Sequence, residues 1–256
     1  MKYSFSFAKK IIFLQCIFTA VFALAVVFVF FRYWFPIPFD ALMGGRHLLV
    51  LILSGLVACG PGLAVLILKS NKQRRELCLD VMLVTGIQLS VLAYGLHVAN
   101  TARPRAVVYE VDRFVAVSMA AVNLDYISEA PDDFKGANWW SKPLLLGIRQ
   151  PRNGHETLSS IELSILGEEP SLRPQWWQAY ELSRLEVKNR MKNLAQLVTK
   201  KPKLTAEVDR IVGEAKSPLV GLYYLPLTAG KSTDDWSVIL DAHANVIAYA
   251  KFGGFD

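Results

Sequence analysis

The sequence predicts a membrane protein in which three N-terminal transmembrane α-helices precede a soluble α+β domain. Hydrophobic residues make up 53% of the 256 residues and the mean hydropathy is +0.30, which is high for a soluble protein. The long apolar runs lie within residues 1–103, whereas charged residues recur every few positions in residues 104–256. We therefore divide the chain into a transmembrane region, 1–103, and a soluble domain, 104–256.

Net charge follows the same division. Residues 1–103 carry 10 Lys and Arg against 3 Asp and Glu, a net charge of +7, while residues 104–256 carry 18 against 19, a net charge of −1. Nucleic-acid binding needs a basic surface on a folded domain, so the net charge of the soluble domain predicts no nucleic-acid partner. The cysteines, Cys16, Cys59 and Cys78, lie in or beside the apolar runs, which excludes a disulfide framework or a cysteine-based metal site in the soluble domain.

Three stretches have the length of about 20 residues that a helix needs to cross a bilayer. They are residues 11–34, 48–68 and 79–99. Pro36 and Pro38 are expected to end the first helix, because proline lacks the backbone N–H. The basic start and the Ala23-Leu24-Ala25 triplet also resemble a signal peptide cleaved after Ala25. Because Val26 to Phe31 continue the apolar run, an uncleaved anchor is the favoured interpretation.

The basic residues of the transmembrane region predict its orientation, since Lys and Arg collect on the cytoplasmic side of a membrane. The N-terminus carries three lysines and the loop after the second stretch carries Lys69, Lys72, Arg74 and Arg75. The first loop has two arginines, partly offset by Asp40. We expect a multi-pass protein of a bacterial inner membrane, with a cytoplasmic N-terminus and a periplasmic C-terminal domain.

Few polar side chains interrupt the apolar stretches. Gln88 lies deep in the third stretch, and Asp80 lies near its cytoplasmic end. Because lipid offers no hydrogen-bond partner, we expect Gln88 to bond a neighbouring helix and Asp80 to pair with Arg74 or Arg75 at the headgroups. An ion or proton pathway is the alternative, and the sequence lacks the chain of buried charges typical of one.

Small residues recur on one face of two predicted spans. Ser54, Ala58 and Gly62 are four residues apart in the second span, and Gly86 and Ser90 are four apart in the third. Such faces let another helix backbone approach closely. Two interpretations are open: packing among the three helices of this chain, and docking of a partner's transmembrane helix.

The soluble domain has strand candidates at both ends and helix candidates between them. Alternating β-branched and aromatic residues predict strands at 105–117, 219–227, 236–241 and 246–252. The first is expected to be a strand or a hairpin, and the turn 242–245 is expected to join the last two. Helical spacing predicts helices at 156–166, 174–199 and 205–216. This order gives an α+β domain whose N- and C-terminal strands share one sheet.

The residues of the soluble domain give little support for catalysis. The sequence has no Gly-x-Ser-x-Gly, phosphate-binding glycine loop or His-Glu-x-x-His. Asp241 and His243 would point to one side of a strand, which suits an acid/base pair, but a surface hairpin explains them equally well. The other histidine of the soluble domain, His155, stands beside Glu156. We predict no enzyme activity, no catalytic residues, no cofactor and no metal.

Two tryptophan pairs, Trp139-Trp140 and Trp176-Trp177, are candidate partner-binding aromatics. Adjacent residues of a strand or helix cannot both face one core, so one member of each pair is expected to be partly exposed. An exposed tryptophan can anchor a protein partner. The alternative is a core residue whose neighbour lies under a loop or at the membrane surface.

Several short sequence motifs are spread along the chain from the first predicted span to the C-terminus. They are Trp34-Phe35-Pro36-Ile37-Pro38, Gly44-Gly45, Gly60-Pro61, Tyr94-Gly95, Ala102-Arg103-Pro104, Tyr109-Glu110-Val111-Asp112-Arg113-Phe114, Glu129-Ala130-Pro131, Arg173-Pro174, Leu225-Pro226-Leu227 and Asp235-Trp236. In these motifs the chain resembles the type IV pilin accessory proteins of the TfpX/TfpZ family, and Tyr109 to Phe114 is the most specific. It departs from the family at Leu56, where the family has an acidic residue.

The resemblance implies a non-enzymatic accessory factor, or chaperone, of type IV pilus assembly. Its expected partner is the major pilin, which such a protein would modulate or stabilise through its membrane helices and its periplasmic domain. Two other classes stay open. One is a scaffold or sensor that binds proteins of the pilus assembly platform, and the other is a membrane-bound enzyme that acts on pilin or on an envelope glycan.

Overall fold

The computed structural model describes residues 5–67, 74–136, 138–215, 218–230 and 232–255. It divides into two compact units. The helical unit comprises Met1–Pro36 and Gly44–Thr101, and the soluble unit comprises Ile37–Met43 and Ala102–Asp256. The basic residues Lys69 and Lys72, with the expected end of the second span at 68, lie outside the described residues.

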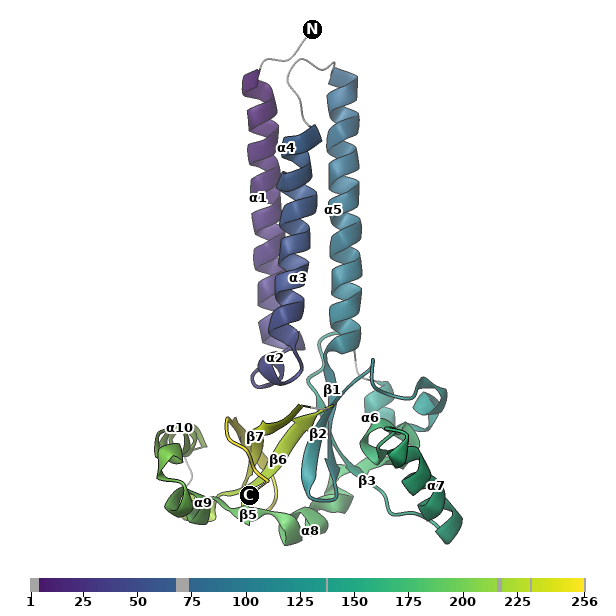
Figure 1. Ribbon diagram of the computed structural model, residues 1–256, viewed down its shortest axis with the longest axis vertical. Helices are drawn as coiled ribbons and strands as arrows, with labels where there is room; N and C mark the ends of the chain where they lie inside the picture. Colours follow the sequence, from purple (N-terminus) through teal and green to yellow (C-terminus); the bar gives the residue numbers. More distant parts are fainter. Residues whose placement is uncertain (1–4, 68–73, 137, 216–217, 231, 256) are drawn as a thin grey trace. The chain divides into compact units, whose positions relative to one another are not determined.

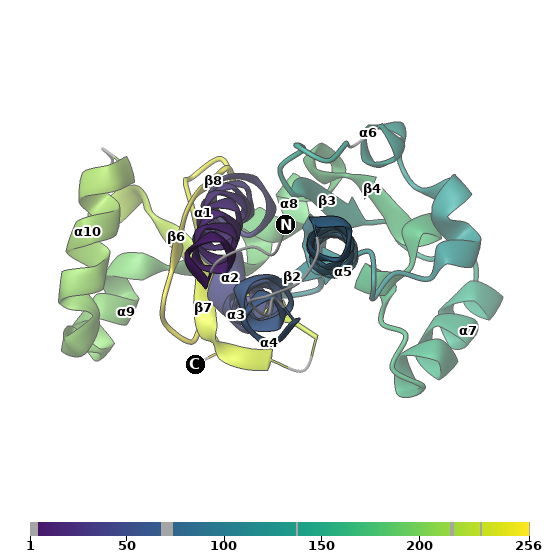
Figure 2. The same cartoon turned by 90° about the horizontal axis from the view of Figure 1, so that it is seen from above.

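Three long apolar helices form the helical unit, as the sequence predicts. They contain candidate membrane spans at Lys9–Trp34, Gly45–Ile67 and Arg75–Ala102. The elements are α1 (Phe5–Val29) with a π-helical turn (Phe30–Trp34), α3 (Gly45–Val57) with a π-helical turn (Ala58–Gly62) and α4 (Leu63–Ile67), and α5 (Arg74–Ala102). They run side by side, and Figure 2 shows them end-on (Figures 1 and 2).

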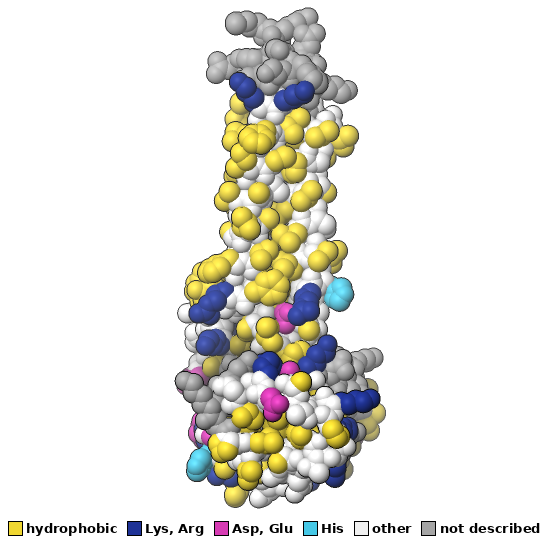
Figure 3. Space-filling model, turned by 90° about the vertical axis from the view of Figure 1, so that its left-hand side faces the viewer, with side chains coloured by type: hydrophobic (Ala, Val, Ile, Leu, Met, Phe, Trp, Pro, Cys, Tyr) yellow, Lys and Arg dark blue, Asp and Glu magenta, His cyan; other side chains and the backbone are white. Residues whose placement is uncertain are grey.

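Each span buries a narrow seam of side chains spaced one helical turn apart. The seam residues are Val26 and Phe30 in the first span, Leu49, Ile52 and Leu56 in the second, and Val84, Gln88 and Leu92 in the third. Other apolar side chains point outward and cover the flank of the helical unit (Figure 3). A helix that is apolar all round suits a lipid environment, because its backbone bonds are internal and its surface needs no water.

One sheet organises the soluble unit. Its strands are β1 (Pro104–Glu110), β2 (Arg113–Ser118), β3 (Leu144–Ile148), β4 (Trp177–Ala179), β5 (Lys192–Asn193), β6 (Tyr223–Ala229), β7 (Ser232–Leu240) and β8 (Val246–Ala250). They lie in the order β4-β3-β1-β2-β6-β7-β8, and β5 pairs with β6. The expected hairpins are confirmed as β1-β2 and β7-β8. The parallel pairing of β2 with β6 confirms that the N- and C-terminal strands share one sheet.

Helices lie towards both ends of this sheet, and α8 lies against its middle strands (Figures 1 and 2). They are α6 (Asp132–Lys135), α7 (Gly154–Ile165), α8 (Tyr180–Arg190), α9 (Leu194–Lys200) and α10 (Thr205–Ala215). The prediction of one helix over 174–199 is wrong. A 3₁₀ turn and β4 precede α8, and Met191 is extended at its end, so that the chain pairs with β6 before Asn193 caps α9.

The sheet buries apolar side chains on both faces, in the period of two that a strand imposes. One face of β1 and β2 presents Val107, Tyr109 and Phe114 to α8. The other face presents Ala106, Val108, Val115 and Val117, which pack with Phe134 and Trp177. The short helix α2 (Phe39–Leu42), between the first two spans, contributes Phe39 and Leu42 to the first of these cores.

Candidate functional site

A buried polar junction links the three spans of the helical unit. We define it as Gln15, Thr19, Gln88 and the carbonyl of Leu56. Gln15 Nε2 donates to Gln88 Oε1, and Gln88 Nε2 donates to Thr19 Oγ1 at 2.8 Å and to the Leu56 carbonyl at 3.4 Å. Thr19 Oγ1 in turn donates to the Gln15 carbonyl at 2.9 Å. Gln88 therefore bonds both neighbouring spans, as its sequence position predicts.

The second span is shaped to admit Gln88. Pro61 has no N–H to give to the preceding turn, and the helix there widens into the π-helical turn Ala58–Gly62. The Leu56 carbonyl of that region accepts from Gln88 instead. Gly60 leaves the space, since a Cβ at this position would lie 2.5 Å from Gln88 Nε2 and 2.8 Å from Thr19 Oγ1. Sequence reasoning missed Gln15 and Thr19, although two polar residues four apart in an apolar run are a signal for such a partner.

Asp80 lies two helical turns before Gln88 in α5 and is half-buried. It is not part of the polar junction as the hydrogen bonds define it. Its expected pairing with Arg74 or Arg75 stays a prediction, because the side chain of Arg74 lies outside the described residues.

The two small-residue faces are left uncovered by the rest of the helical unit. Ser54, Ala58 and Gly62 are all exposed, and so are Gly86 and Ser90. The hydroxyl of Ser54 donates to the Leu51 carbonyl and that of Ser90 to the Gly86 carbonyl, both at 2.9 Å. Both faces are therefore small and internally satisfied, which is the surface that a second helix can approach in lipid.

Other glycines make the contacts within the chain. A Cβ at Gly55 would lie 3.1 Å from Val91 Cγ1, and one at Gly95 would lie 3.0 Å from Ile52 Cγ1. Close approach of the second and third spans thus uses Gly55, which is next to Ser54 in sequence, and Gly95, which is five residues after Ser90. Ser54, Ala58 and Gly62 are exposed, so the close approach of the second and third spans does not use them.

The tryptophan pairs depart from the expectation that each has one exposed member. Trp139 and Trp140 are both exposed, at 52% and 57%, whereas Trp176 and Trp177 are both buried, at 6% and 5%. Trp176 ends a 3₁₀ turn and Trp177 begins β4, so the backbone changes direction between the two rings. Trp139 and Trp140 lie outside regular structure, where the alternation of a strand does not apply.

The buried pair is held by polar and cationic contacts. Trp177 packs edge-on to Phe134 at 4.8 Å, and its Nε1 donates to the Ser171 carbonyl at 2.9 Å. The guanidinium groups of Arg149 and Arg173 lie 4.8 and 5.2 Å from the centre of the Trp176 ring. Trp176 is thus part of the packed interior of the soluble unit and is not an exposed anchor.

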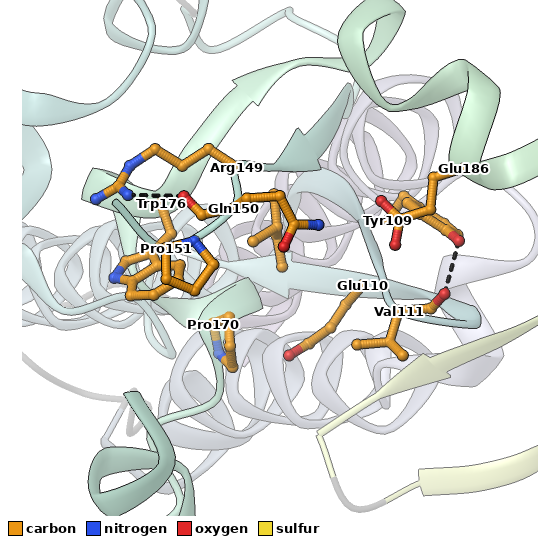
Figure 4. Close-up of a pocket in the computed structure, with 10 residues that line it drawn as sticks. Tyr109, Glu110, Val111, Arg149, Gln150, Pro151, Pro170, Trp176 and Glu186 are labelled. Carbon is orange, nitrogen blue, oxygen red and sulfur yellow. Dashed lines mark hydrogen bonds between the residues drawn. The ribbon is translucent and has the colours of Figure 1, made fainter. Parts of the chain in front are cut away.

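A pocket of about 160 Å³ lies against Trp176, at the tip of the β1-β2 hairpin (Figure 4). Its lining is mostly apolar, and its charged lining residues are Glu110, Arg149 and Glu186. Val111 at the tip has φ of 57°, which a β-branched residue rarely adopts, and Tyr109 Oη donates to its carbonyl at 2.6 Å. The most specific family-like motif therefore forms a strained turn beside this pocket.

Two carboxyl groups near this pocket have displaced pKa values of opposite sign. Burial raises the pKa of Glu110, the nearby Glu169 adds to the effect, and Ser171 opposes it. The hydrogen bond from Arg149, supported by the backbone N–H of Arg152, lowers the pKa of Glu156 to about 2. Glu156 Oε1 lies 2.6 Å from Arg149 Nη2, so the charge of Arg149, one of the two cations over Trp176, is neutralised locally.

Asp241 and His243 form a turn. Asp241 Oδ1 accepts the backbone N–H groups of His243 and Asn245, both at 2.8 Å, and Asp241 Oδ2 accepts from the Asn245 amide. Burial acts to raise the pKa of Asp241, but these hydrogen bonds outweigh it and the pKa is lowered. His243 and His155 are exposed. No group of three or more His, Cys, Asp or Glu among the described residues is placed to hold a metal ion.

Comparison with known proteins finds similar chains of one kind. The chain is 30% identical over 256 residues to a fimbrial assembly protein, serogroup E1, from Dichelobacter nodosus, and 30% identical to the serogroup I protein of that organism. Each match covers 100% of this chain and 99% of the relative. A third relative, of serogroups C1 and C2, is 33% identical over 129 residues, 50% of this chain and 98% of its own length. No protein-family model and no solved structure matches the chain.

Proposed function

Because the chain belongs to the family of fimbrial assembly proteins, we propose that it is a non-enzymatic membrane factor that holds the major pilin before its entry into the pilus. The likeness of its motifs to the TfpX/TfpZ family supports a type IV pilus. The observation that carries the proposal is the pair of uncovered small-residue faces on spans two and three.

The proposed orientation places the N-terminus in the cytoplasm and the soluble unit in the periplasm of a bacterial inner membrane. Lys9 and Lys10 begin the first span and Arg75 begins the third, so the ends that would face the cytoplasm are basic. In this orientation the protein shares both compartments with a pilin, which waits in the inner membrane with a hydrophobic helix and a periplasmic head.

In the membrane, we assign the pilin helix to the face formed by Ser54, Ala58 and Gly62. Lipid gives no hydrophobic drive for two helices to associate, so contact depends on close packing, and small residues permit it. This face is exposed, and its one hydroxyl is satisfied within its own helix by the Leu51 carbonyl. Gly86 and Ser90 offer a second small face on span three.

In the soluble unit, α7 has its apolar side turned outward. Leu158, Ile161 and Ile165 follow one face of the helix and are 65%, 53% and 79% exposed. The inner side instead carries Ser160 and Ser164, whose oxygens accept from Arg173. A surface helix ordinarily turns its apolar stripe to the core, so this reversed helix is a candidate contact for the pilin head.

Two weak contacts on the same partner reinforce each other. Once one part of a pilin is bound, the other part meets its site at a high effective concentration, and the combined affinity exceeds that of either contact alone. A factor with one site in the membrane and one outside it can therefore hold a pilin firmly and still release it stepwise. This behaviour suits a subunit that must leave for the pilus.

Site-specific crosslinking tests the membrane contact. The native Cys16, Cys59 and Cys78 are first replaced by alanine, and Ala58→Cys is introduced. The control is Val21→Cys on α1, which is 59% exposed and lies 13 residues from Trp34, as Ala58 lies 13 residues from Gly45. We expect a disulfide or short-linker crosslink to a pilin cysteine from position 58 and much less from position 21, in cells that assemble pili.

Equal crosslinking from positions 58 and 21, or none from 58 while the protein is present at normal level, contradicts the proposal. Mass spectrometry of the crosslinked species separates the other classes. A product with proteins of the assembly platform indicates a scaffold or sensor. Loss of piliation in Asp241→Ala or His243→Ala variants at unchanged protein level indicates an enzyme.

A further inference from the structure

Arg103, the residue that follows the third span in the chain, binds the backbone of the loop that carries the exposed pair Trp139 and Trp140. Arg103 is joined by one peptide bond to Ala102, the last residue of that span. Its Nη1 donates to the Trp139 carbonyl at 2.6 Å and its Nη2 to the Asn138 carbonyl at 2.8 Å. Arg105 Nη1 adds a bond to the Asn138 carbonyl at 3.2 Å.

The loop that carries the pair is ordered by its own bonds. Asn138 Oδ1 accepts the Trp140 N–H at 2.9 Å, and Ser141 Oγ accepts the Asn138 N–H at 2.9 Å. Arg103 is 1% exposed, and burial, with the neighbouring charge of Arg105, lowers its pKa to about 10. Arg103 thus stays cationic at neutral pH, and the loop that carries both tryptophans keeps its place beside Arg103.

The length of the third span sets the depth of that point. Its 28 residues extend about 42 Å at about 1.5 Å per residue, against a hydrocarbon core of about 30 Å and a total bilayer thickness of about 40–45 Å. A span of this length centred in the bilayer ends among the lipid headgroups. Arg103 therefore lies at the headgroup level. Trp139, whose carbonyl accepts from Arg103, and its neighbour Trp140 lie near the same depth.

We infer that Trp139 and Trp140 insert into the lipid headgroup region and anchor the soluble unit on the bilayer surface. Tryptophan concentrates at this depth in membrane proteins, because its ring is apolar and its N–H needs a polar partner. Lys142, which is exposed two residues later, supplies a cation for lipid phosphates. The anchor needs no pilin, so its test is independent of the test of the proposed function.

Fluorescence quenching in vesicles tests this anchor. The full-length chain is reconstituted without pilin into phosphatidylcholine vesicles, with and without bromine on carbons 6 and 7 of the acyl chain. The emission of Trp139 and Trp140 is taken as the difference between wild type and the double variant Trp139→Phe and Trp140→Phe. We expect bromolipid to reduce this difference emission at least about twofold, and aqueous iodide to leave it largely unquenched.

The matched control is the buried pair, Trp176→Phe and Trp177→Phe, whose difference emission should respond to neither quencher. If the emission of Trp139 and Trp140 is not quenched by bromolipid and is fully quenched by iodide, the inference is overturned. The pair is then a candidate contact for a protein partner, as the sequence suggested. The Arg103 bonds go to backbone carbonyls, so the phenylalanine variant keeps them.

If the double variant is not recovered, a spin label replaces the tryptophan signal. Lys142→Cys in the cysteine-free chain carries the nitroxide, and exposed Leu182→Cys on α8 serves as the reference position. We expect the label at 142 to relax faster with oxygen, relative to a water-soluble nickel complex, than the label at 182. Equal ratios at the two positions overturn the inference.

Discussion

Gly60 determines how closely the second span approaches the polar junction. A Cβ at this position would lie 2.5 Å from Gln88 Nε2 and 2.8 Å from Thr19 Oγ1, so alanine must displace a buried, hydrogen-bonded side chain. We expect Gly60→Ala to destabilise the helical unit by about 1–3 kcal/mol, as overpacking of a dense core does. The measurement is the midpoint of unfolding of the purified protein in mixed micelles with increasing SDS.

Gly86→Ala is the matched control for that prediction, since it makes the same change one span away. No heavy atom lies within 4 Å of a Cβ at Gly86, and alanine is favoured over glycine in a helix by about 0.5–1 kcal/mol. Its midpoint should equal or exceed that of wild type. A Gly60→Ala midpoint at or above the Gly86→Ala value would show that the junction is not tightly packed.

The sequence identifies some residues of the candidate sites but not their partners. Gln88 is conspicuous because it is polar in an apolar run, and its role as a bridge is confirmed. Which backbone carbonyl needs it depends on Pro61 and on the widened turn, which only the three-dimensional path of the second span shows. The burial of Trp176 likewise depends on Arg149 and Arg173, which are distant from each other in sequence.

Glu110 and Glu156 should respond to pH with opposite signs. The pKa of Glu110 is raised in the fold above its usual 4.5, so its ionisation destabilises the fold as pH rises through and above that value. The pKa of Glu156 is lowered to about 2, so the stability it contributes is present above pH 4.5 and is lost as pH falls towards 2. We expect Glu110→Gln to be more stable than wild type at pH 7 and Glu156→Gln to be less stable.

Unfolding midpoints of the two glutamine variants and wild type, measured across pH 3 to 8, test this pair of signs. The Glu110→Gln advantage should vanish below about pH 4.5, where the wild-type carboxyl is protonated in both states. The Glu156→Gln deficit should persist to lower pH. If the unfolding midpoints of all three proteins changed with pH in the same way, the pKa directions given for both Glu110 and Glu156 would be contradicted.

At the scale of helices and strands, a strong local sequence pattern predicts the element that forms, whereas a weak pattern does not. The β1-β2 and β7-β8 hairpins follow from alternation and a turn, and both are confirmed. The short strand β3 was not predicted, because a brief apolar run at Leu144–Ile148 has no period of its own. The interval 174–199 has helical composition throughout, and its division into α8 and α9 depends on pairing of β5 with the distant strand β6.

In the reversed helix α7, replacing apolar residues should cost less stability than replacing serines, which is the opposite of the usual order. Ile161→Ser and Ile165→Ser together should change the free energy of unfolding by no more than about 0.5 kcal/mol, because both side chains already face solvent. Ser160→Ala and Ser164→Ala together should destabilise by about 1–3 kcal/mol, because Arg173 then loses two hydroxyl acceptors while buried.

Chemical unfolding monitored by far-UV circular dichroism compares these two double variants. The isoleucine variant has a second readout, since under the proposed function it should recover less pilin by crosslinking than wild type. A large loss of stability in the isoleucine variant would show that its outer face is covered within the folded protein, and would remove α7 as a partner surface.

For the whole molecule, apolar length predicts the three spans, and composition predicts that a soluble unit follows them. Neither predicts that residues 37–43 belong with the soluble unit. That segment is short and lies between proline and glycine residues, so in sequence it resembles an ordinary loop between two spans. Its assignment depends on the burial of Phe39 and Leu42 among strand residues that come about 70 to 200 positions later.

Phe39 therefore fixes the link between the first two spans to the sheet. It is 2% exposed and packs edge-on to Tyr249 of β8, with ring centres 5.5 Å apart. We expect Phe39→Ala to destabilise the soluble unit by about 3–5 kcal/mol, as deletion of a buried phenylalanine does. Ile37→Ala is the matched control in the same segment, because Ile37 is 72% exposed, and it should have little effect.

Thermal unfolding followed by near-UV circular dichroism reports this loss directly, because Tyr249 lies in the affected core. Limited proteolysis gives a second reading, since release of residues 37–43 should open cleavage within that segment in Phe39→Ala and not in Ile37→Ala. If both variants unfold and cleave like wild type, Phe39 does not hold the segment to the sheet, and residues 37–43 connect the first two spans without a role in the soluble core.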